Sequence, residues 1–174
     1  IDISNTATES VAYACICMRG HTYYSNYEIK NNMTSGARYN IAFSAGVAQN
    51  VHIHDNLIQG KSSSTATGIF LHTLTNVINV TIENNDIQGV LTSMKGPNTQ
   101  PSSAIATLVH YRNNTDNGAY SNDAYCTTPK ASLASSIKTL GKTGDFIPST
   151  GHSTVAGWLC VGNGAWVALT STAA

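Results

Sequence analysis

The chain has 174 residues and no formal net charge, and 10% of its residues are charged, against about 25% in an ordinary soluble domain. This balance argues against a nucleic-acid-binding protein, which needs a basic surface, and no apolar run is long enough to span a membrane. Asn, Ser and Thr supply the polarity, with 56 of the 174 residues. These uncharged polar side chains suit turns, stacked ladders and neutral sugars.

Short apolar segments with a strand-like composition recur along the chain. They are Ala14–Met18, Asn40–Ser44, Gly68–His72 and Ala104–His110. Each of the first three is followed by a longer motif that contains a second strand. We therefore expect one short strand of this kind in every coil of a repetitive fold.

The longer motif is a ten-residue phrase with apolar residues at its first and third positions, Asn at its sixth and Gly at its last. It occurs three times, as Tyr27–Gly36, Val51–Gly60 and Val80–Gly89. Self-similarity at a period of a few tens of residues indicates a repeat architecture. Because the repeated unit is strand-like, the phrase predicts a β-solenoid, an all-β fold of stacked coils.

The sixth position of the phrase holds Asn32, Asn56 and Asn85. Asn tolerates left-handed backbone conformations better than most residues, so we expect a bend at each of these three residues. Their side-chain amides would stack into a ladder at the coil spacing of about 4.8 Å.

Alternation along the phrase assigns the side chains to two faces. Ile29, Ile53 and Ile82 are expected inside the solenoid. The residues expected outside are Glu28, Lys30, His52, His54, Thr81 and Glu83.

The phrase pattern stops near residue 112, and the tail has a different character. Two apolar runs, which contain Trp158 and Trp166, flank Gly162–Gly164, a strong hairpin signal. We expect the two indoles to pack against one another or against a neighbour. The predicted organisation is a solenoid over residues 1–125, then a crossover and a small antiparallel β-hairpin module over residues 126–174.

The phrases resemble coils of the right-handed parallel β-helix of pectate-lyase-like proteins, with the three Asn residues in the place of that family's asparagine ladder. The tail is similar to a segment that follows the β-helix in bacteriophage tailspike and tail-fibre proteins. It carries Gly144-Asp-Phe-Ile, Gly157-Trp-Leu-Cys and Gly164-Ala-Trp. Because the chain also begins at Ile1, we expect it to be the C-terminal part of a longer tailspike.

This resemblance implies a function and a set of partners. Tailspikes are trimeric virion components, made in the cytoplasm of the bacterial host, that recognise the host by binding its surface polysaccharide. The expected partners are therefore two further copies of the chain, a bacterial polysaccharide and other tail proteins. Nucleic acid and membrane insertion are not expected. A purely structural, trimer-stabilising role remains an alternative.

Tailspikes often cleave the polysaccharide, and a depolymerase of the glycoside hydrolase or lyase type is a second alternative. Glycan hydrolysis usually needs a pair of carboxylates. The candidates are Glu83, Glu28 and Asp55. Lys30, His54 and Glu83 are predicted to stack on adjacent coils, which a catalytic site and an ordinary solvated face would both allow.

Sugar contact favours exposed aromatic rings and polar groups. We expect Tyr111, Tyr120 and Tyr125, in a Gly- and Asn-rich stretch, to be exposed or at a subunit contact and to bind polysaccharide with His54. The pattern His52-x-His54 places two imidazoles on one strand face, as a metal site would. Structural histidines are the preferred interpretation, with no metal and no cofactor.

Overall fold

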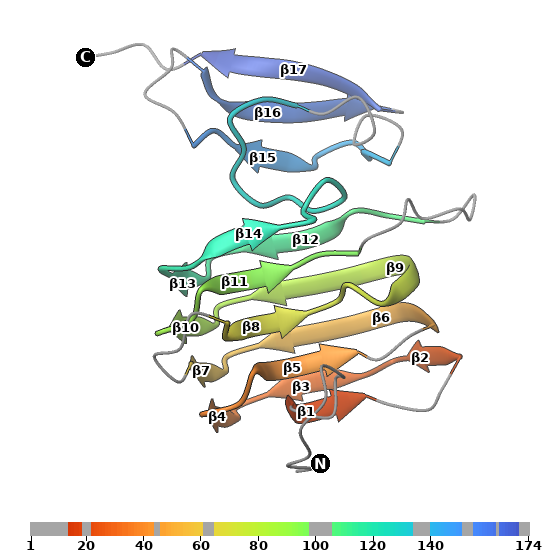
Figure 1. Cartoon of the computed structure of the whole chain (residues 1–174). Coiled ribbons are helices and arrows are strands. Elements are labelled where there is room, and N and C mark those ends of the chain that lie inside the picture. The colour runs from red at the N-terminus through yellow and green to blue at the C-terminus, as the bar shows by residue number, and fades with distance from the viewer. Residues whose placement is uncertain are drawn as a thin grey trace.

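The structure is a computed structural model that describes residues 14–18, 22–43, 46–60, 65–97, 106–133, 140–150, 155–162 and 164–170. Parallel strands form stacked coils, and an antiparallel sheet follows beyond the last coil (Figure 1). The predicted fold class, a parallel β-solenoid with a small antiparallel module, is confirmed. Within the described ranges no helix is long and apolar enough to cross a membrane.

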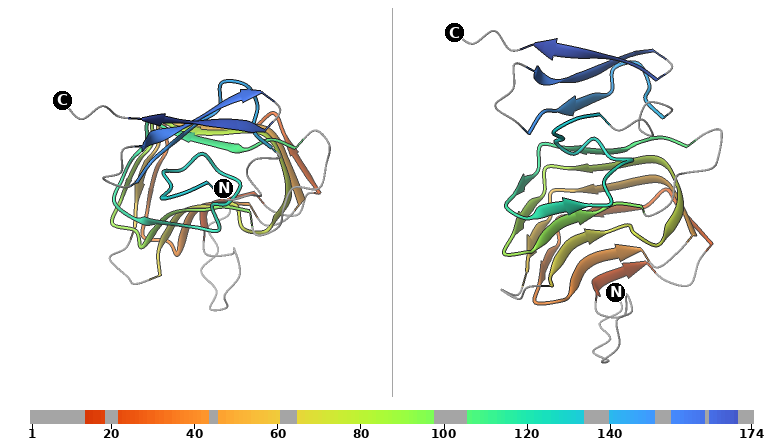
Figure 2. Two further views of the ribbon diagram at one scale, coloured as in Figure 1. Left: turned by 90° about the horizontal axis from the view of Figure 1, so that it is seen from above. Right: turned by 45° about the horizontal axis from the view of Figure 1, so that its top comes forward.

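Three parallel sheets form the walls of the solenoid (Figure 2). The first contains β1 (Ala14–Met18), β5 (Tyr39–Phe43), β8 (Thr67–Phe70), β11 (Thr92–Lys95) and β14 (Ala119–Ser121). The second contains β4 (Met33–Ser35), β7 (Leu57–Gln59), β10 (Asp86–Gln88) and β13 (Thr115–Asp116). The third contains β2 (Tyr23–Ser25), β3 (Glu28–Lys30), β6 (Gly46–His54), β9 (Leu74–Glu83) and β12 (Val109–Arg112).

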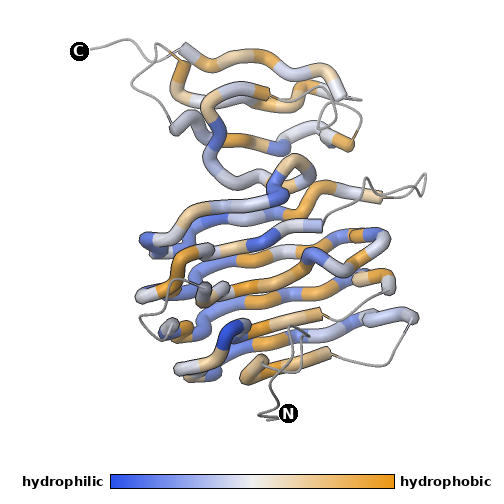
Figure 3. The backbone as a smooth tube through the Cα atoms, in the orientation of Figure 1, coloured by the Kyte–Doolittle hydropathy of each residue, from blue (hydrophilic) through white to orange (hydrophobic). Residues whose placement is uncertain are grey.

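The register of the third sheet follows the phrase. Ile29 pairs with Ile53, and Ile53 pairs with Ile82, so the third position of each phrase stacks on the next. All three side chains lie in the buried core. Apolar and polar stretches alternate along the strands of the solenoid (Figure 3). The predicted inward isoleucines are therefore confirmed.

A fourth copy of the phrase exists, and the expectation that the pattern stops near residue 112 is wrong. Val109–Gly118 has Tyr111 at its third position, Asn114 at its sixth and Gly at its last. Tyr111 pairs with Ile82, and Val109 with Val80. The strand β12 thus belongs to the third sheet, although Ala104–His110 was expected to be a short strand of the first kind. Residues 104 and 105 lie outside the described part of the chain.

The asparagine ladder is confirmed and extends to Asn114. The Asn56 side-chain oxygen accepts hydrogen bonds from the backbone and side-chain nitrogens of Asn32, both at 3.0 Å. The Asn56 amide nitrogen donates to Asn85 Oδ1 at 2.9 Å and to the Ile29 carbonyl oxygen at 2.9 Å. Asn85 donates in the same way to Asn114 Oδ1 at 2.9 Å. Each rung therefore satisfies buried backbone groups of the neighbouring coil.

The left-handed residue at this bend is the fifth of the phrase, one before the ladder residue. Asn31, Asp55, Asn84 and Asn113 have positive φ angles between 53° and 54°. The expectation that the sixth residue takes this conformation is wrong, because its side chain turns inward to hydrogen-bond while the preceding residue makes the turn.

A second ladder, which the phrase did not reveal, lies at another corner of the coil. Asn26, Asn50 and Asn79 also have positive φ angles. Asn50 donates from its side chain to Asn26 Oδ1 at 3.1 Å, and Asn79 donates to Asn50 Oδ1 at 3.0 Å. These contacts are exposed, so they connect the corners of neighbouring coils but are not part of the buried core.

The antiparallel sheet consists of β15 (Phe146–Pro148), β16 (Val155–Gly162) and β17 (Ala165–Thr170), in that order. The predicted hairpin is the β16–β17 pair. The predicted domain boundary, between residues 125 and 126, lies between the last solenoid strand and β15. One face of this sheet packs on the last coil in a cluster with Leu108 and Ile147 at its centre. Trp158 and Trp166 are half-buried in that same cluster.

A partly buried ion pair joins the end of the solenoid to the antiparallel sheet. Lys130 Nζ lies 2.7 Å from Asp123 Oδ2, which also accepts a hydrogen bond from Thr128 at 2.6 Å. The backbone of Lys130 forms a bridge with Ser149, next to β15. Burial alone would raise the pKa of Asp123, but the hydrogen bonds from Lys130 and Thr128 outweigh it and lower the pKa.

We predict that Asn56→Ala lowers the free energy of unfolding by about 3 kcal/mol, because it leaves buried amide and carbonyl groups of Asn32 and Ile29 without partners. Asn50→Gly, which removes an exposed rung but keeps the left-handed backbone, should cost about 1 kcal/mol or less. Urea denaturation measures both. Equal losses in the two variants would contradict the role assigned to the inner ladder.

Asp123→Asn is predicted to destabilise the protein at neutral pH by about 3 kcal/mol, because Lys130 then keeps a buried charge without its carboxylate. The folded-state pKa of Asp123 is lowered, so its contribution is present above its unfolded pKa and is lost as the pH falls below about 4. The difference in unfolding free energy between the two proteins should therefore shrink in acid. A pH-independent difference would count against this pairing.

Candidate functional site

The outward positions of the phrase form two rows of polar side chains on the third sheet. The fourth positions stack as predicted for Lys30, His54 and Glu83, and Arg112 continues the row. The second positions of the four phrases stack in a parallel row of Glu28, His52, Thr81 and His110. Sequence reasoning missed Arg112, although the Asn pair that follows it marks the fourth phrase.

The two rows are connected by diagonal contacts between imidazoles and carboxylates. His52 Nε2 lies 2.8 Å from Glu83 Oε1, and His54 Nε2 lies 3.0 Å from Glu28 Oε1. The two imidazole rings are stacked, with 4.0 Å between their centroids. Each histidine therefore binds a glutamate from a neighbouring coil, which brings together residues that lie 31 and 26 positions apart.

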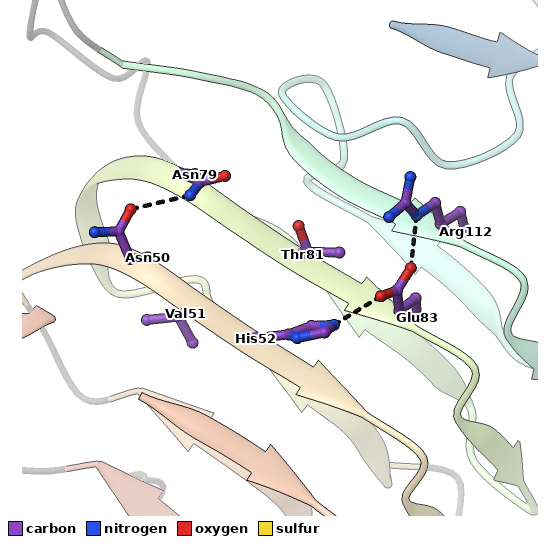
Figure 4. A pocket seen from close by; sticks show the side chains of 7 residues that line it. All are labelled: Asn50, Val51, His52, Asn79, Thr81, Glu83 and Arg112. Atoms are coloured by element: carbon purple, nitrogen blue, oxygen red, sulfur yellow. Dashed lines mark hydrogen bonds and ion pairs between the residues drawn. The ribbon is translucent and has the colours of Figure 1, made fainter. Parts of the chain in front are cut away.

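Glu83 lies between two cationic or potentially cationic groups. Arg112 Nε donates to Glu83 Oε2 at 2.7 Å, on the side opposite His52 (Figure 4). Partial burial alone would raise the pKa of Glu83, but the hydrogen bonds from Arg112 and His52 outweigh it and leave the pKa below its ordinary value. Glu83 is therefore an ionised acceptor at neutral pH.

Glu28 and Asp55 contact His54 from two sides. Glu28 also pairs with Lys30 at 2.8 Å, and the Lys30 and His54 hydrogen bonds lower the Glu28 pKa. Asp55 Oδ2 lies 2.7 Å from His54 Nδ1. The Asp55 hydrogen bond is the largest influence on His54, and the pKa of this imidazole is raised although burial opposes the shift. The predicted candidates thus lie in two hydrogen-bonded groups, Glu83 in one and Glu28 with Asp55 in the other, which meet where the His52 and His54 rings stack.

A shallow groove of about 230 Å³ runs over β6, β9 and β12 beside these groups (Figure 4). The Asn50–Asn79 rung of the outer ladder lies at one end, and the Glu83–Arg112 pair lies at the other. The lining residues are Asn50, Val51, His52, Asn79, Thr81, Glu83 and Arg112.

A second cavity, of about 510 Å³, lies where the last coil meets the antiparallel sheet. Arg112 lines this cavity as well as the groove, so the two hollows adjoin at its side chain. His110, the half-exposed Phe146 and the buried Asp145 also line it. His110 Nε2 lies 3.6 Å from Asp145 Oδ1.

The predicted tyrosine cluster is partly a core element. Tyr111 is 5% exposed, because it occupies the inward third position of the fourth phrase. Its hydroxyl donates to Asp116 at 2.6 Å, and the Tyr120 hydroxyl donates to the same carboxylate at 2.9 Å. Burial and the Asp116 charge raise the pKa of both phenols. The expectation that Tyr111 is exposed or at a subunit contact is wrong, because its ring lies in the core of the solenoid. Tyr120 and Tyr125 are half-buried.

Among the described residues, Glu28, His52 and His54 form a group whose potential metal-binding atoms converge, within 4.8 Å of one another. Sequence reasoning noted the two histidines but had no third donor, because Glu28 comes from the adjacent coil. The arrangement offers fixed charges, hydrogen-bond donors and acceptors, and a convergent set of nitrogen and oxygen atoms.

Comparison with protein-family models, with curated proteins and with solved structures found no match to this chain.

Proposed function

We propose that this chain is part of a bacteriophage tailspike or tail fibre and that its third sheet binds a bacterial surface polysaccharide. The observation that carries this proposal is the groove lined by Asn50, Asn79, Thr81, Glu83 and Arg112, which crosses adjacent coils. It offers hydroxyl, amide, carboxylate and guanidinium groups side by side. A hydroxyl-rich ligand needs such alternating donors and acceptors.

The form of the groove supports a chain-like neutral or weakly acidic ligand. It is shallow and adjoins the second cavity at Arg112, so an extended sugar chain could follow both hollows. The absence of net charge argues against a nucleic-acid ligand. The half-exposed Phe146 at the second cavity offers an apolar ring face against which a pyranose can pack.

The tailspike assignment rests on the tail motif together with the solenoid. Gly157-Trp-Leu-Cys lies on β16 and Gly164-Ala-Trp leads into β17, so the resembling segment forms one hairpin. That hairpin packs on the last coil, as a module that follows a β-helix would.

Binding is favoured over cleavage by the state of the carboxylates. A glycosidase needs one carboxyl group with a raised pKa to protonate the leaving oxygen. The pKa values of Glu83 and Glu28 are both lowered by their cationic neighbours. Depolymerase activity is accordingly the second candidate, to be tested on the same variants.

We predict that purified bacterial capsular and O-antigen polysaccharides, titrated by calorimetry, include at least one that binds the chain. Arg112→Ala and Glu83→Gln should each weaken that binding about tenfold, because each removes a charge-assisted hydrogen bond. Lys95→Ala removes a cation from the first sheet and should leave the affinity unchanged.

Equal affinity in all four proteins would contradict the groove as the binding site, and failure of every polysaccharide would contradict the proposed function. Release of reducing ends that disappears in Glu83→Gln would instead favour the depolymerase.

A homotrimer is the assembly that we propose for the chain, with the antiparallel sheet at the contact. Its outer face carries Val161, Val167 and Leu169, which are between 39% and 52% exposed. The edge strand β17 has no charged residue, and its residues are exposed except at Trp166. Its hydropathy is apolar to intermediate along its length (Figure 3). An exposed apolar edge strand invites pairing with another chain.

Val167→Glu together with Leu169→Glu is predicted to dissociate the trimer to a folded monomer of 18.4 kDa, since it places charge on the proposed contact. Leu91→Glu introduces one such charge at an exposed apolar residue of the solenoid and should leave the trimer intact. Sedimentation velocity distinguishes the species. A monomeric unsubstituted chain would rule out this assembly.

A further inference from the structure

We propose that Glu28, His52 and His54 form a binding site for a transition-metal dication of the zinc class. Their donor atoms come from β3 and β6, adjacent strands in the third sheet, and lie within 4.8 Å of one another. Two imidazoles and a carboxylate suit Zn²⁺. Mg²⁺ and Ca²⁺ prefer sites made of oxygen donors alone, so they fit this group poorly.

Each imidazole is held by a carboxylate outside the donor set. Asp55 contacts His54 Nδ1 at 2.7 Å, which leaves Nε2 as the donor. Glu83 contacts His52 Nε2 at 2.8 Å, which leaves Nδ1 as the donor. Metal-binding histidines in proteins almost always donate their second ring N–H to such a partner, which fixes the tautomer and the ring orientation.

The carboxylate of Glu28 is already oriented toward the donor nitrogen of His54. Oε1 lies 3.0 Å from His54 Nε2, while Oε2 faces Lys30 at 2.8 Å. A metal ion between Oε1 and Nε2 would therefore replace a shared proton and leave the Lys30 contact in place.

The donor atoms must shift slightly around the ion, because Glu28 Oε1 and His54 Nε2 are 3.0 Å apart while the group as a whole lies within 4.8 Å. Zinc bonds of 2.0–2.1 Å in a tetrahedral arrangement separate the donors by about 3.4 Å. The side chains of Glu28 and His52 are 50% and 40% exposed and have room to turn, His52 about its contact with Glu83 and out of its stack on His54, whereas His54 is 13% exposed and is held by Asp55. Three protein donors leave one coordination position open toward solvent.

The test is calorimetric titration of the metal-free chain with Zn²⁺ at about pH 8, where the imidazoles compete less with protons. We expect one zinc ion per chain, and His52→Ala and His54→Ala should each lower the affinity at least tenfold. Asp55→Asn should lower it by about 10- to 100-fold. His72→Ala removes an imidazole that lies on another part of the solenoid and should leave the affinity unchanged.

Thermal unfolding gives a second readout, because a ligand that binds the folded state raises the melting temperature. Zinc should raise the melting temperature of the unsubstituted chain and of His72→Ala, but not of the His52→Ala/His54→Ala double variant. If a histidine substitution unfolds the coil, Glu28→Gln is used in its place. Glu28 is half-exposed, and glutamine preserves the size of its side chain.

Zinc binding of equal strength in the double variant, or no zinc binding by the unsubstituted chain, would overturn the site. The probe is the metal alone, so this result is independent of the proposed polysaccharide binding.

Discussion

The side-chain ladder of Asn32, Asn56, Asn85 and Asn114 is the interaction on which the rest of the structure depends. A coil must turn sharply between the third and second sheets, and the turn leaves backbone groups inside that have no strand partner. Asn56 and Asn85 each supply a carbonyl oxygen to the coil on one side and an amide to the coil on the other, and Asn32 and Asn114 continue the ladder at its two ends. Since an unpaired buried polar group costs about 1–3 kcal/mol, the ladder makes this turn repeatable.

Repetition of the turn also decides what the outer surface looks like. Because every coil bends at the same phrase position, the second and fourth residues of neighbouring phrases stand side by side on the third sheet. Carboxylates then meet imidazoles and a guanidinium at hydrogen-bond distance. The groove and the convergent donor group are thus two consequences of one register, although they would serve different ligands.

The two ends of the solenoid are unlike each other. The last coil is covered by the antiparallel sheet through Leu108, Ile147 and the two indoles, and the Asp123–Lys130 pair fixes the connection. Covering the coil in this way buries one face of the sheet and leaves the other face and the edge strand β17 apolar and exposed. The sheet that caps the solenoid therefore also presents the exposed apolar surface at which we propose that another chain binds.

The sequence by itself determined the class of fold, the inward isoleucines and the ladder, because these are local repeats whose physical meaning does not depend on neighbours. It also determined that Lys30, His54 and Glu83 stack, since equal phrase positions must coincide. The sequence did not reveal the fourth phrase, because Tyr111 stands at the position where the other three phrases have isoleucine. Only the tertiary structure decided which side chains meet: Glu28 reaches His54 and Glu83 reaches His52 diagonally across coils, and Tyr111 is buried. Such contacts depend on rotamers and on loops of unequal length between coils, which no periodicity in the chain records.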